Sequence, residues 1–265
     1  MDLQEFFGIH PHSAIGFSGG VDSAYLLYAA KKYAERVCAY YVKSVFQPRF
    51  EMEDALRLAK ELDVPVKVLE VDVLNVPRVK DNPPERCYYC KQAIFGTIKK
   101  AAEADGFSLL LDGTNASDEV SDRPGMKALG ELSVRSPLRE CALTKGKIRE
   151  LSKEAGLFTW DKPAYACLAS RFVYGEEITE EKLLMVDRAE QYLIEHGFLE
   201  ERVRMHGNMA RIEVPARDIA RLAEESIRIP LWERFREIGF SFVTLDLKGY
   251  RQGSMNETLE KEGKP

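Results

Sequence analysis

The chain has 265 residues, 45% hydrophobic and 31% charged, which is the composition of a globular protein with one large domain or a larger and a smaller one. A net charge of −5 makes nucleic acid an unexpected partner, because non-specific affinity for it comes mainly from Lys and Arg. No apolar run is long enough to span a membrane and the N-terminus lacks a basic secretory signal, so we expect a cytoplasmic protein without membrane contact.

The first half of the chain alternates short β-rich runs with helical patterns. A strand is expected at residues 14–17, a helix over 23–34 and a second strand at 36–42. Apolar residues then recur at helical spacing over 52–62, before a third strand at 66–71. This order predicts a βαβαβ arrangement.

A Pro-rich, charged loop at residues 75–85 precedes a helix expected around 92–104 and a strand at 109–112. The last of these is a continuous apolar run, which indicates a strand covered on both faces, as in a parallel sheet. The predicted fold class is therefore α/β, with a doubly wound parallel sheet. Ligands of such sheets bind beyond the carboxyl ends of the strands.

The pattern changes after residue 175. The elements expected there are a long helix, two hairpin strands joined by Gly207-Asn208 and, after further helices, a final strand, over residues 178–195, 203–206, 210–214 and 242–247. We predict a main domain of residues 1–175 and a smaller α+β domain of residues 176–265, which would bind substrate or mediate oligomerisation.

Ser18-Gly19-Gly20-Val21-Asp22-Ser23 lies between the first expected strand and the first expected helix. Backbone N–H groups at a helix N-terminus favour an anion, and glycines allow it to approach closely. The two hydroxyls add donors, and Asp22 would hold the Mg²⁺ that accompanies a nucleotide. The loop lacks the Gly-Lys-Ser/Thr ending of γ-phosphate-transferring loops. An ordinary turn of small residues is the alternative.

This loop resembles the SGGxDS loop, or PP-loop, of the ATP pyrophosphatase family, which includes NAD synthetase, GMP synthetase and the tRNA thiolases. The resemblance implies cleavage of ATP between the α and β phosphates, transfer of AMP to a carboxylate or carbonyl oxygen, and displacement of AMP by nitrogen or sulfur. Asp112-Gly113-Thr114-Asn115 with Asp118-Glu119 is similar to the family's second motif, although a polar turn after a strand is the alternative. The residues expected to bind ATP are Ser18, Gly19, Gly20, Val21, Asp22, Ser23, Ser44, Gly113 and Thr114, with Asp22 and Asp118 as ligands of Mg²⁺.

Two cysteine segments refine the resemblance. Cys87-Tyr88-Tyr89-Cys90, preceded by Asn82-Pro83-Pro84-Glu85-Arg86, and Cys167 within residues 162–171 resemble the LarE family, ATP-dependent sulfur transferases of nickel-pincer cofactor synthesis. The resemblance implies a small-molecule substrate, a pyridinium dicarboxylate mononucleotide, whose carboxylates become thiocarboxylates, and it suggests a homo-oligomer. In the single-cysteine branch of that family one cysteine gives up its own sulfur, and by match that residue is Cys167.

The chain departs from that branch because it also carries Cys87 and Cys90. Together with Cys167 they suit a [4Fe–4S] cluster with one open iron that would carry a sulfide. Two alternatives stay open: Cys167 as a sacrificial thiol without a cluster, and a zinc ion, which normally needs a fourth ligand. Cys38 is expected to be a buried small residue and Cys141 a packing residue.

The phosphate of a mononucleotide requires cationic partners, and arginine supplies planar donors. Arg171 closely follows Cys167, while Arg202 and Arg204 alternate on a predicted strand and would project to one face. Ser170 adds a hydroxyl. We expect these four residues to bind the substrate phosphate, with solvated surface arginines as the alternative.

Three other functions compete with sulfur transfer to a mononucleotide, and in one of them, an ammonia-using ligase, the cysteine set would have no purpose. A tRNA thiolase shares the loop and can use three cysteines, but the acidic net charge and the lack of an evident RNA-binding domain count against it. A non-catalytic ATP-sensing module would bind ATP without turnover, and release of pyrophosphate separates it from an enzyme.

Overall fold

The computed structural model describes residues 1–118, 124–163, 165–251 and 254–256. Their contacts divide the chain into two compact units, and each is described here by itself. The first unit comprises Met1–Val79 and Glu85–Tyr165, and the second comprises Lys80–Pro84 and Ala166–Pro265. The second unit thus begins before the boundary expected after residue 175, and it includes a short segment from the first half. The roles predicted for the C-terminal domain stay predictions.

A parallel sheet forms the centre of the first unit. Its order is β3-β2-β1-β4, with bounds Val66–Glu70, Arg36–Lys43, His12–Gly16 and Leu110–Leu111. Ile15 aligns with Ala39 on one side and with Leu111 on the other. The predicted α/β class with a parallel sheet is confirmed. β4 is shorter than the expected 109–112, and Asp112, which directly follows it, accepts side-chain hydrogen bonds from Thr114 and Ser136.

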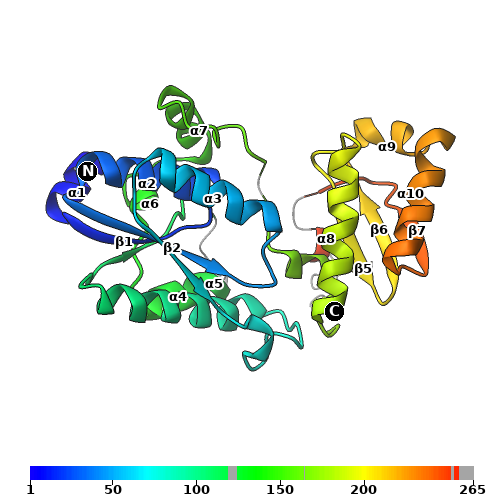
Figure 1. Ribbon diagram of the computed structural model, residues 1–265, viewed down its shortest axis with the longest axis horizontal. Helices are drawn as coiled ribbons and strands as arrows, with labels where there is room; N and C mark the ends of the chain where they lie inside the picture. The colour runs from blue at the N-terminus through cyan, green and yellow to red at the C-terminus, as the bar shows by residue number, and fades with distance from the viewer. Residues whose placement is uncertain (119–123, 164, 252–253, 257–265) are drawn as a thin grey trace, which may run out of the picture. The chain divides into compact units, whose positions relative to one another are not determined.

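Helices cover both faces of this sheet (Figure 1). Strand residues alternate between the faces, so that Ile15 and Tyr41 enter one core and Ala14 and Tyr40 the other. The first core is closed by α1 (Leu3–Ile9), α2 (Val21–Tyr33), α3 (Arg49–Glu61), α6 (Pro137–Glu140) and α7 (Lys145–Glu154), and the second by α4 (Arg86–Ala104) and α5 (Pro124–Glu131). Cys38 is buried in the second core, which confirms its predicted role as a small buried residue.

Two helices begin earlier than the sequence indicates. α2 starts at Val21, directly after the glycine pair, and α4 starts at Arg86 instead of near residue 92. Tyr88 N–H donates to the Glu85 carbonyl, so the first turn of α4 forms immediately after the proline-containing loop. Aromatic and Cys residues are modest helix formers, which is why this turn has no sequence signal. Cys87 and Cys90 therefore lie on a helix.

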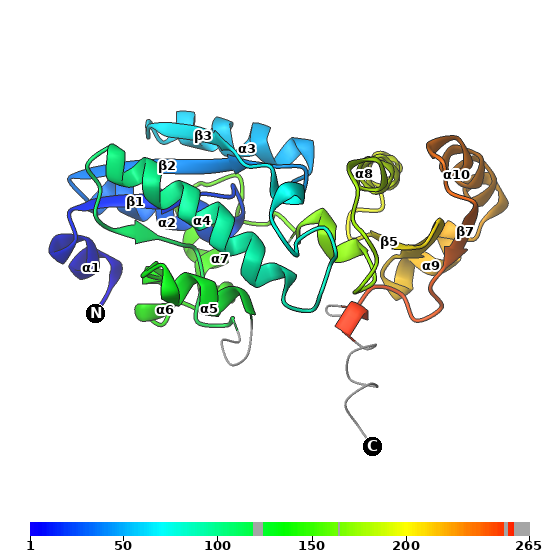
Figure 2. The ribbon, with the colours of Figure 1, turned by 90° about the horizontal axis from the view of Figure 1, so that it is seen from below.

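The second unit contains a mixed three-stranded sheet of order β5-β6-β7, with bounds Arg202–His206, Met209–Glu213 and Phe242–Leu245. β5 and β6 form an antiparallel hairpin through Gly207, whose φ of 59° favours glycine, and β7 runs parallel to β6. α8 packs on β5 and α10 on β7 (Figure 2). The predicted α+β character and the hairpin are confirmed.

The remaining elements are α8 (Glu180–Glu195), α9 (Ala216–Leu222), α10 (Glu225–Ile238) and the 3₁₀ turns η1 (Val73–Asn75), η2 (Leu168–Arg171) and η3 (Ser254–Asn256). Within the described parts of the chain, no helix is both long and apolar enough to cross a membrane.

Candidate nucleotide and sulfur site

The loop between β1 and α2 turns sharply at its two glycines. Gly19 has φ +74°, and a Cβ there would lie 2.9 Å from the Ala55 Cβ, so only glycine fits without a shift. Gly20 is the N-cap of α2 and offers no side-chain cap. The first intrahelical hydrogen bond runs from Ala24 N–H to the Gly20 carbonyl, which leaves the preceding amides of the first turn without an intrahelical partner. This turn is suited to an anion.

The two hydroxyls of the loop bind each other and the backbone. Ser18 Oγ lies 3.1 Å from Ser23 Oγ, and Ser23 Oγ donates to the Gly20 carbonyl at 3.1 Å. Ser18 N–H donates to Ser23 Oγ, and Gly20 N–H to Ser18 Oγ. These hydrogen bonds therefore hold the loop folded against the N-terminus of α2.

The segment after β4 lies against this loop. A Cβ on Gly113 would come within 3.0 Å of the Ser23 nitrogen, so the glycine lets the two backbones meet. Asp112 is buried and accepts hydrogen bonds of 2.5 Å from Thr114 Oγ1 and from Ser136 Oγ. The Thr114 hydroxyl thus fixes the turn, and contact of Thr114 with ATP stays a prediction.

Asp22 is the charged residue of the loop, and only one of its two carboxylate oxygens has a hydrogen-bond partner among the described residues. Its Oδ2 accepts from Lys145 Nζ at 2.6 Å, while its Oδ1 is buried without a hydrogen-bond partner among the described residues. Burial raises the pKa of Asp22, Lys145 opposes that shift, and nearby Asp118 adds to it. A second cation at Oδ1 would satisfy this carboxylate.

Asp118 completes an acidic pair with Asp22. Its Oδ2 accepts from Asn115 N–H at 2.9 Å, and its carbonyl accepts from Arg139. Glu119 lies outside the described residues. No group of three or more His, Cys, Asp or Glu among the described residues is arranged to hold a metal ion. Two carboxylates nevertheless fit Mg²⁺, which usually takes one or two together with substrate phosphates and water.

Ser44 follows β2 at the same edge of the sheet as the loop. Its hydroxyl donates to Gln47 Oε1 at 2.6 Å and accepts from Phe46 N–H at 3.2 Å. These bonds shape the turn into α3, and contact of Ser44 with ATP stays a prediction.

Cys87 and Cys90 lie one turn apart at the start of α4. Cys87 is exposed and Cys90 is partly buried. Arg86 Nη2 lies 3.7 Å from Cys87 Sγ, which places a cation next to that sulfur. Cys167 belongs to the second unit, where it is partly buried and precedes η2; Ala164 in its loop lies outside the described residues. A cluster bound by all three cysteines stays a prediction.

Arg171 is fully buried, in contrast to a solvated surface arginine. Its Nε and Nη2 donate to the two carboxylate oxygens of Glu190 at 2.9 and 2.8 Å. Its Nη1 donates to the carbonyls of Ala166 and Cys167 and to Ser170 Oγ. Arg171 therefore anchors the Cys167 loop to α8, and any contact with a substrate phosphate would be additional to these bonds.

Arg202 and Arg204 are also buried, at 4% and 5% exposure, so the solvated alternative is wrong for both. Arg204 donates to Glu213 Oε2, to the Ser170 carbonyl and to Ser254 Oγ. Arg202 stacks over the Tyr250 ring at 5.1 Å. Buried arginines with fixed orientations suit an anionic ligand. Their contact with the substrate phosphate stays a prediction.

Sequence reasoning missed three partners of the expected site residues: Lys145, Glu190 and Glu213. Lys145 pairs with Asp22 across 123 positions of sequence, and Glu190 pairs with Arg171 across 19. Glu213 pairs with Arg204 diagonally across the β5–β6 hairpin, in which Glu213 is aligned with Arg202. The hairpin was recognisable, so Glu213 had a usable signal. The other two pairings depend on tertiary packing and have no linear motif.

Three comparisons with known proteins address this site. Residues 12–79, which contain the glycine loop, match the family model described as "Queuosine biosynthesis protein QueC". The chain is 39% identical to an uncharacterized protein of Synechocystis sp. over 98% of this chain and 97% of that protein. It is 37% identical to the pyridinium-3,5-bisthiocarboxylic acid mononucleotide synthase of Lactiplantibacillus plantarum, over 93% of this chain and 90% of the synthase. The chain belongs to the LarE family.

A more distant relation runs to the tRNA thiolases. The chain is 26% identical to the tRNA-specific 2-thiouridylase MnmA of Pseudothermotoga lettingae, over 55% of this chain and 52% of that protein. LarE membership makes the chain an enzyme, a sulfurtransferase of the PP-loop superfamily. It therefore rules out the non-catalytic ATP-sensing alternative.

Proposed function

We propose that this LarE chain uses ATP and Mg²⁺ to convert the carboxylates of pyridinium-3,5-dicarboxylate mononucleotide into thiocarboxylates, with release of AMP and pyrophosphate. The observation that carries the proposal is the Gly19-Gly20 turn at a helix start without a side-chain cap, beside the partly buried Asp22 carboxylate, whose Oδ1 has no hydrogen-bond partner among the described residues. The printed name of the synthase from L. plantarum supports the substrate.

The first step is adenylation of the substrate. The amides at the start of α2 bind the pyrophosphate portion of ATP, and Asp22 and Asp118 would hold Mg²⁺ against it. A carboxylate oxygen of the substrate attacks the α-phosphorus, the bond from that phosphorus to the bridging oxygen breaks, and pyrophosphate leaves. The protein contributes position and charge, and Lys145 next to Asp22 supports this anionic centre.

The second step brings sulfur to the activated carbon. Sulfur attacks the acyl carbon, the carbon–oxygen bond to AMP breaks, and AMP leaves with the electron pair. We propose that Cys87, Cys90 and Cys167 bind a [4Fe–4S] cluster, which when bound would supply a sulfide. Arg86 beside Cys87 and Arg171 beneath the Cys167 loop support this, because cations favour the thiolate form of cysteine.

The substrate phosphate is proposed to bind in the second unit, at Ser170, Arg171, Arg202 and Arg204. All three arginines are buried, and Glu190 and Glu213 fix two of the guanidinium groups in one orientation. A fixed, partly desolvated guanidinium recognises phosphate well because little entropy is lost on binding. Free thiols at Cys38, Cys87 and Cys141 fit our proposal that the enzyme works in the reducing cytoplasm.

Turnover of the dicarboxylate substrate tests the reaction. Anaerobically purified enzyme with ATP, Mg²⁺ and substrate should release AMP and pyrophosphate and yield a product in which sulfur has replaced oxygen. Release of ADP and phosphate instead would contradict the proposal. Sulfur incorporated into tRNA, with none into the mononucleotide, would favour the thiolase alternative. The similarity to MnmA is the reason to include tRNA in the test.

The sulfur source is tested on the same preparation. We expect iron and acid-labile sulfide in stoichiometric amounts, repeated turnover when sulfide is added, and an unchanged intact mass of the chain. Cys87→Ser should lose the iron. Loss of the elements of H₂S from the chain at Cys167 after one turnover would instead establish a sacrificial thiol and overturn the cluster.

A further inference from the structure

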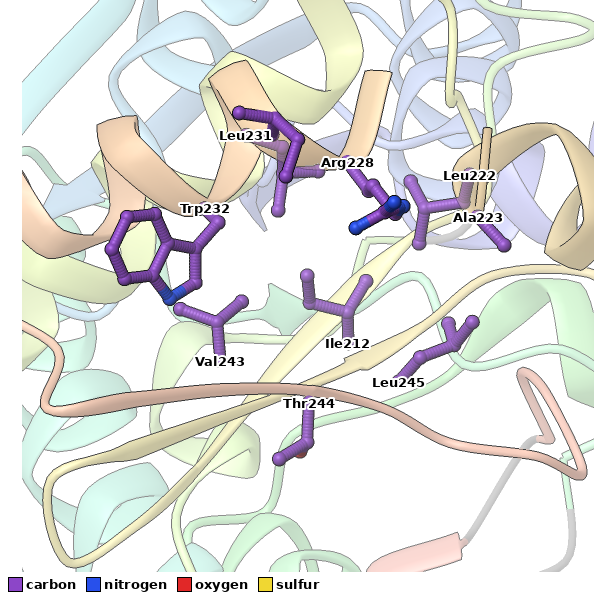
Figure 3. Close-up of a pocket in the computed structure, with 10 residues that line it drawn as sticks. Ile212, Leu222, Ala223, Arg228, Leu231, Trp232, Val243, Thr244 and Leu245 are labelled. Atoms are coloured by element: carbon purple, nitrogen blue, oxygen red, sulfur yellow. The ribbon is translucent and has the colours of Figure 1, made fainter. Parts of the chain in front are cut away.

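The sheet of the second unit presents different residues on its two faces. Figure 3 shows Ile212 of β6 pointing towards Leu231 and Trp232 of α10, so this side of the strand borders an apolar groove. Successive residues of a strand point to opposite faces of the sheet. Arg211 and Glu213, which flank Ile212 in the chain, therefore project from the other face, which is charged.

Arginines outnumber carboxylates on and next to this charged face. Directly opposite residues of an antiparallel pair share a face, and Arg204 lies opposite Arg211 in the β5–β6 hairpin. Asp246, just after β7, lies 3.7 Å from Arg211 and 3.4 Å from Arg251. The group consists of four arginines and two carboxylates: Arg202, Arg204, Arg211, Arg251, Glu213 and Asp246. This excess of positive charge suits a phosphate ligand.

The 3₁₀ turn η3 packs on this charged face. Ser254 and Met255 are 6% and 8% exposed, so they are buried nearly as deeply as Arg204. Met255 Sδ lies 3.6 Å from Arg211 Nη2, and Ser254 N–H donates to the Arg251 carbonyl at 3.3 Å. The turn therefore brings a hydroxyl group into the arginine cluster.

The Ser254 hydroxyl bridges a cation and an anion. Its oxygen accepts a hydrogen bond from Arg204 Nη2 at 3.2 Å and donates to Glu213 Oε1 at 2.8 Å. The same Glu213 oxygen also accepts from Arg211 Nη2 at 2.9 Å. Glu213 Oε1 would therefore keep a donor if the serine hydroxyl turned away, while Arg204 would still hold the serine oxygen. A hydroxyl can rotate in this way because its hydrogen has no fixed direction.

Arg204 connects this hydroxyl to the proposed phosphate site. Its Nη1 donates to the Ser170 carbonyl at 3.0 Å, and its Nη2 donates to Ser254 Oγ. The two serines therefore lie at the same end of one guanidinium group. Ser170 and Arg204 are both residues of the proposed phosphate site, so Ser254 is a direct neighbour of that site.

We propose that Ser254 is a further residue of the substrate phosphate site, where its hydroxyl turns from Glu213 and donates a hydrogen bond to a phosphate oxygen. Arg204 keeps the serine oxygen in place, and Arg211 continues to satisfy Glu213. The inference rests on the proposed function, since it takes the phosphate of the mononucleotide as the ligand. It gives η3 a role in distinguishing the phosphorylated substrate from its nucleoside.

The binding of two ligands tests this role. Calorimetric titration of the full chain compares the dicarboxylate mononucleotide with the corresponding nucleoside, which lacks the phosphate. Ser254→Ala should raise the Kd of the mononucleotide about tenfold or more and leave that of the nucleoside within about twofold, because only the phosphate offers a charged acceptor. Ser254→Thr keeps a hydroxyl, so it should bind the mononucleotide at least about threefold more tightly than the alanine variant.

The matched control is Ser241→Ala, which removes an exposed serine hydroxyl of the same unit that accepts from Asn208 Nδ2 at 2.8 Å. Both Kd values should stay unchanged in this control. Equal weakening of both ligands by Ser254→Ala would indicate a purely structural role, and tighter binding of the mononucleotide would mean that the hydroxyl competes with the phosphate. Either result overturns the inference, as does a threonine variant that binds no better than the alanine variant.

The wild-type titration separates this inference from the proposed function. A wild-type chain that binds no mononucleotide would overturn the proposed function together with the role of Ser254. Wild-type binding of the mononucleotide that Ser254→Ala leaves unaffected would overturn the role of Ser254 alone.

Discussion

Lys145 Nζ lies 2.6 Å from Asp22 Oδ2 and places a cation from the start of α7 at the start of α2. A cation there stabilises the loop carboxylate and reaches the region where pyrophosphate is proposed to bind. Lys145→Met should therefore raise the KM for ATP at least about tenfold, which is the effect of roughly 1.4 kcal/mol. Steady-state kinetics of AMP formation measures this. Lys147→Met, whose lysine pairs with exposed Glu150, is the control and should be neutral.

Gly113→Ala should push the segment after β4 away from the start of α2, where the two backbones meet in the nucleotide site. The added methyl would lie 3.0 Å from the Ser23 nitrogen, so either segment must shift. We expect a loss of about 1–3 kcal/mol in stability together with weaker binding of ATP, by analogy with overpacked cores. Calorimetric titration with ATP and thermal unfolding measure both effects. Gly130→Ala, where the new carbon meets no atom within 4 Å apart from the neighbouring backbone of its own helix, should bind ATP normally.

Removal of Glu190 should show how much the buried Arg171–Glu190 ion pair stabilises the second unit. Glu190→Ala leaves the Arg171 guanidinium buried without its carboxylate, which typically costs about 3–5 kcal/mol. Trp160 belongs to the first unit and Trp232 to the second. In a Trp160→Phe background, the fluorescence of Trp232 therefore reports the unfolding of the second unit in urea. Glu195→Ala on the exposed end of α8 is the control. Equal midpoints for both variants would contradict the assignment.

Glu201 should make the stability of the second unit depend on pH. It is fully buried, its carboxylate oxygens have no hydrogen-bond partner from another described residue, and burial, with a further contribution from Glu190, raises its pKa to about 8. The unfolded chain releases this proton near the ordinary pKa of 4.5. Between these values the folded state binds more protons, so stability falls as the pH rises, by at most about 1.4 kcal/mol per pH unit.

Glu201→Gln tests this relation, because glutamine keeps the shape and cannot ionise. The variant should lose the decline between pH 5 and 8, a window set roughly by the two pKa values, and should exceed the wild type in stability at the upper end. Urea unfolding followed by the same Trp232 signal measures it. A wild-type curve that is flat across this window would show that the carboxyl is not held protonated.

The sequence predicted the parts of the site that depend on local conformation. The Gly19-Gly20 turn needs backbone geometry that only glycine adopts easily, and the strand and helix around it follow hydrophobic periodicity. The parallel sheet followed from continuous apolar runs such as Leu109–Leu111. These signals depend only on residues that are close together in the chain, so they can be read from a single sequence.

What the sequence did not predict depends on tertiary contacts or on weak propensities. Lys145 has no feature near it that points to Asp22, and the burial of Arg171 against Glu190 and of Arg204 against Glu213 has no local signal either. The start of α4 was missed because Cys-Tyr-Tyr-Cys lacks strong helix formers. The approach of the two cysteines to Cys167 likewise stays a prediction.

The mutual hydrogen bonds of Ser18 and Ser23 fix the shape of the loop from within the chain. A receptor that is already curved loses little conformational freedom on capture, so more of its contact energy remains as affinity. ATP should consequently associate with a modest entropic penalty and little rearrangement. The hydroxyls then need only exchange one acceptor for another as the phosphoryl oxygens arrive.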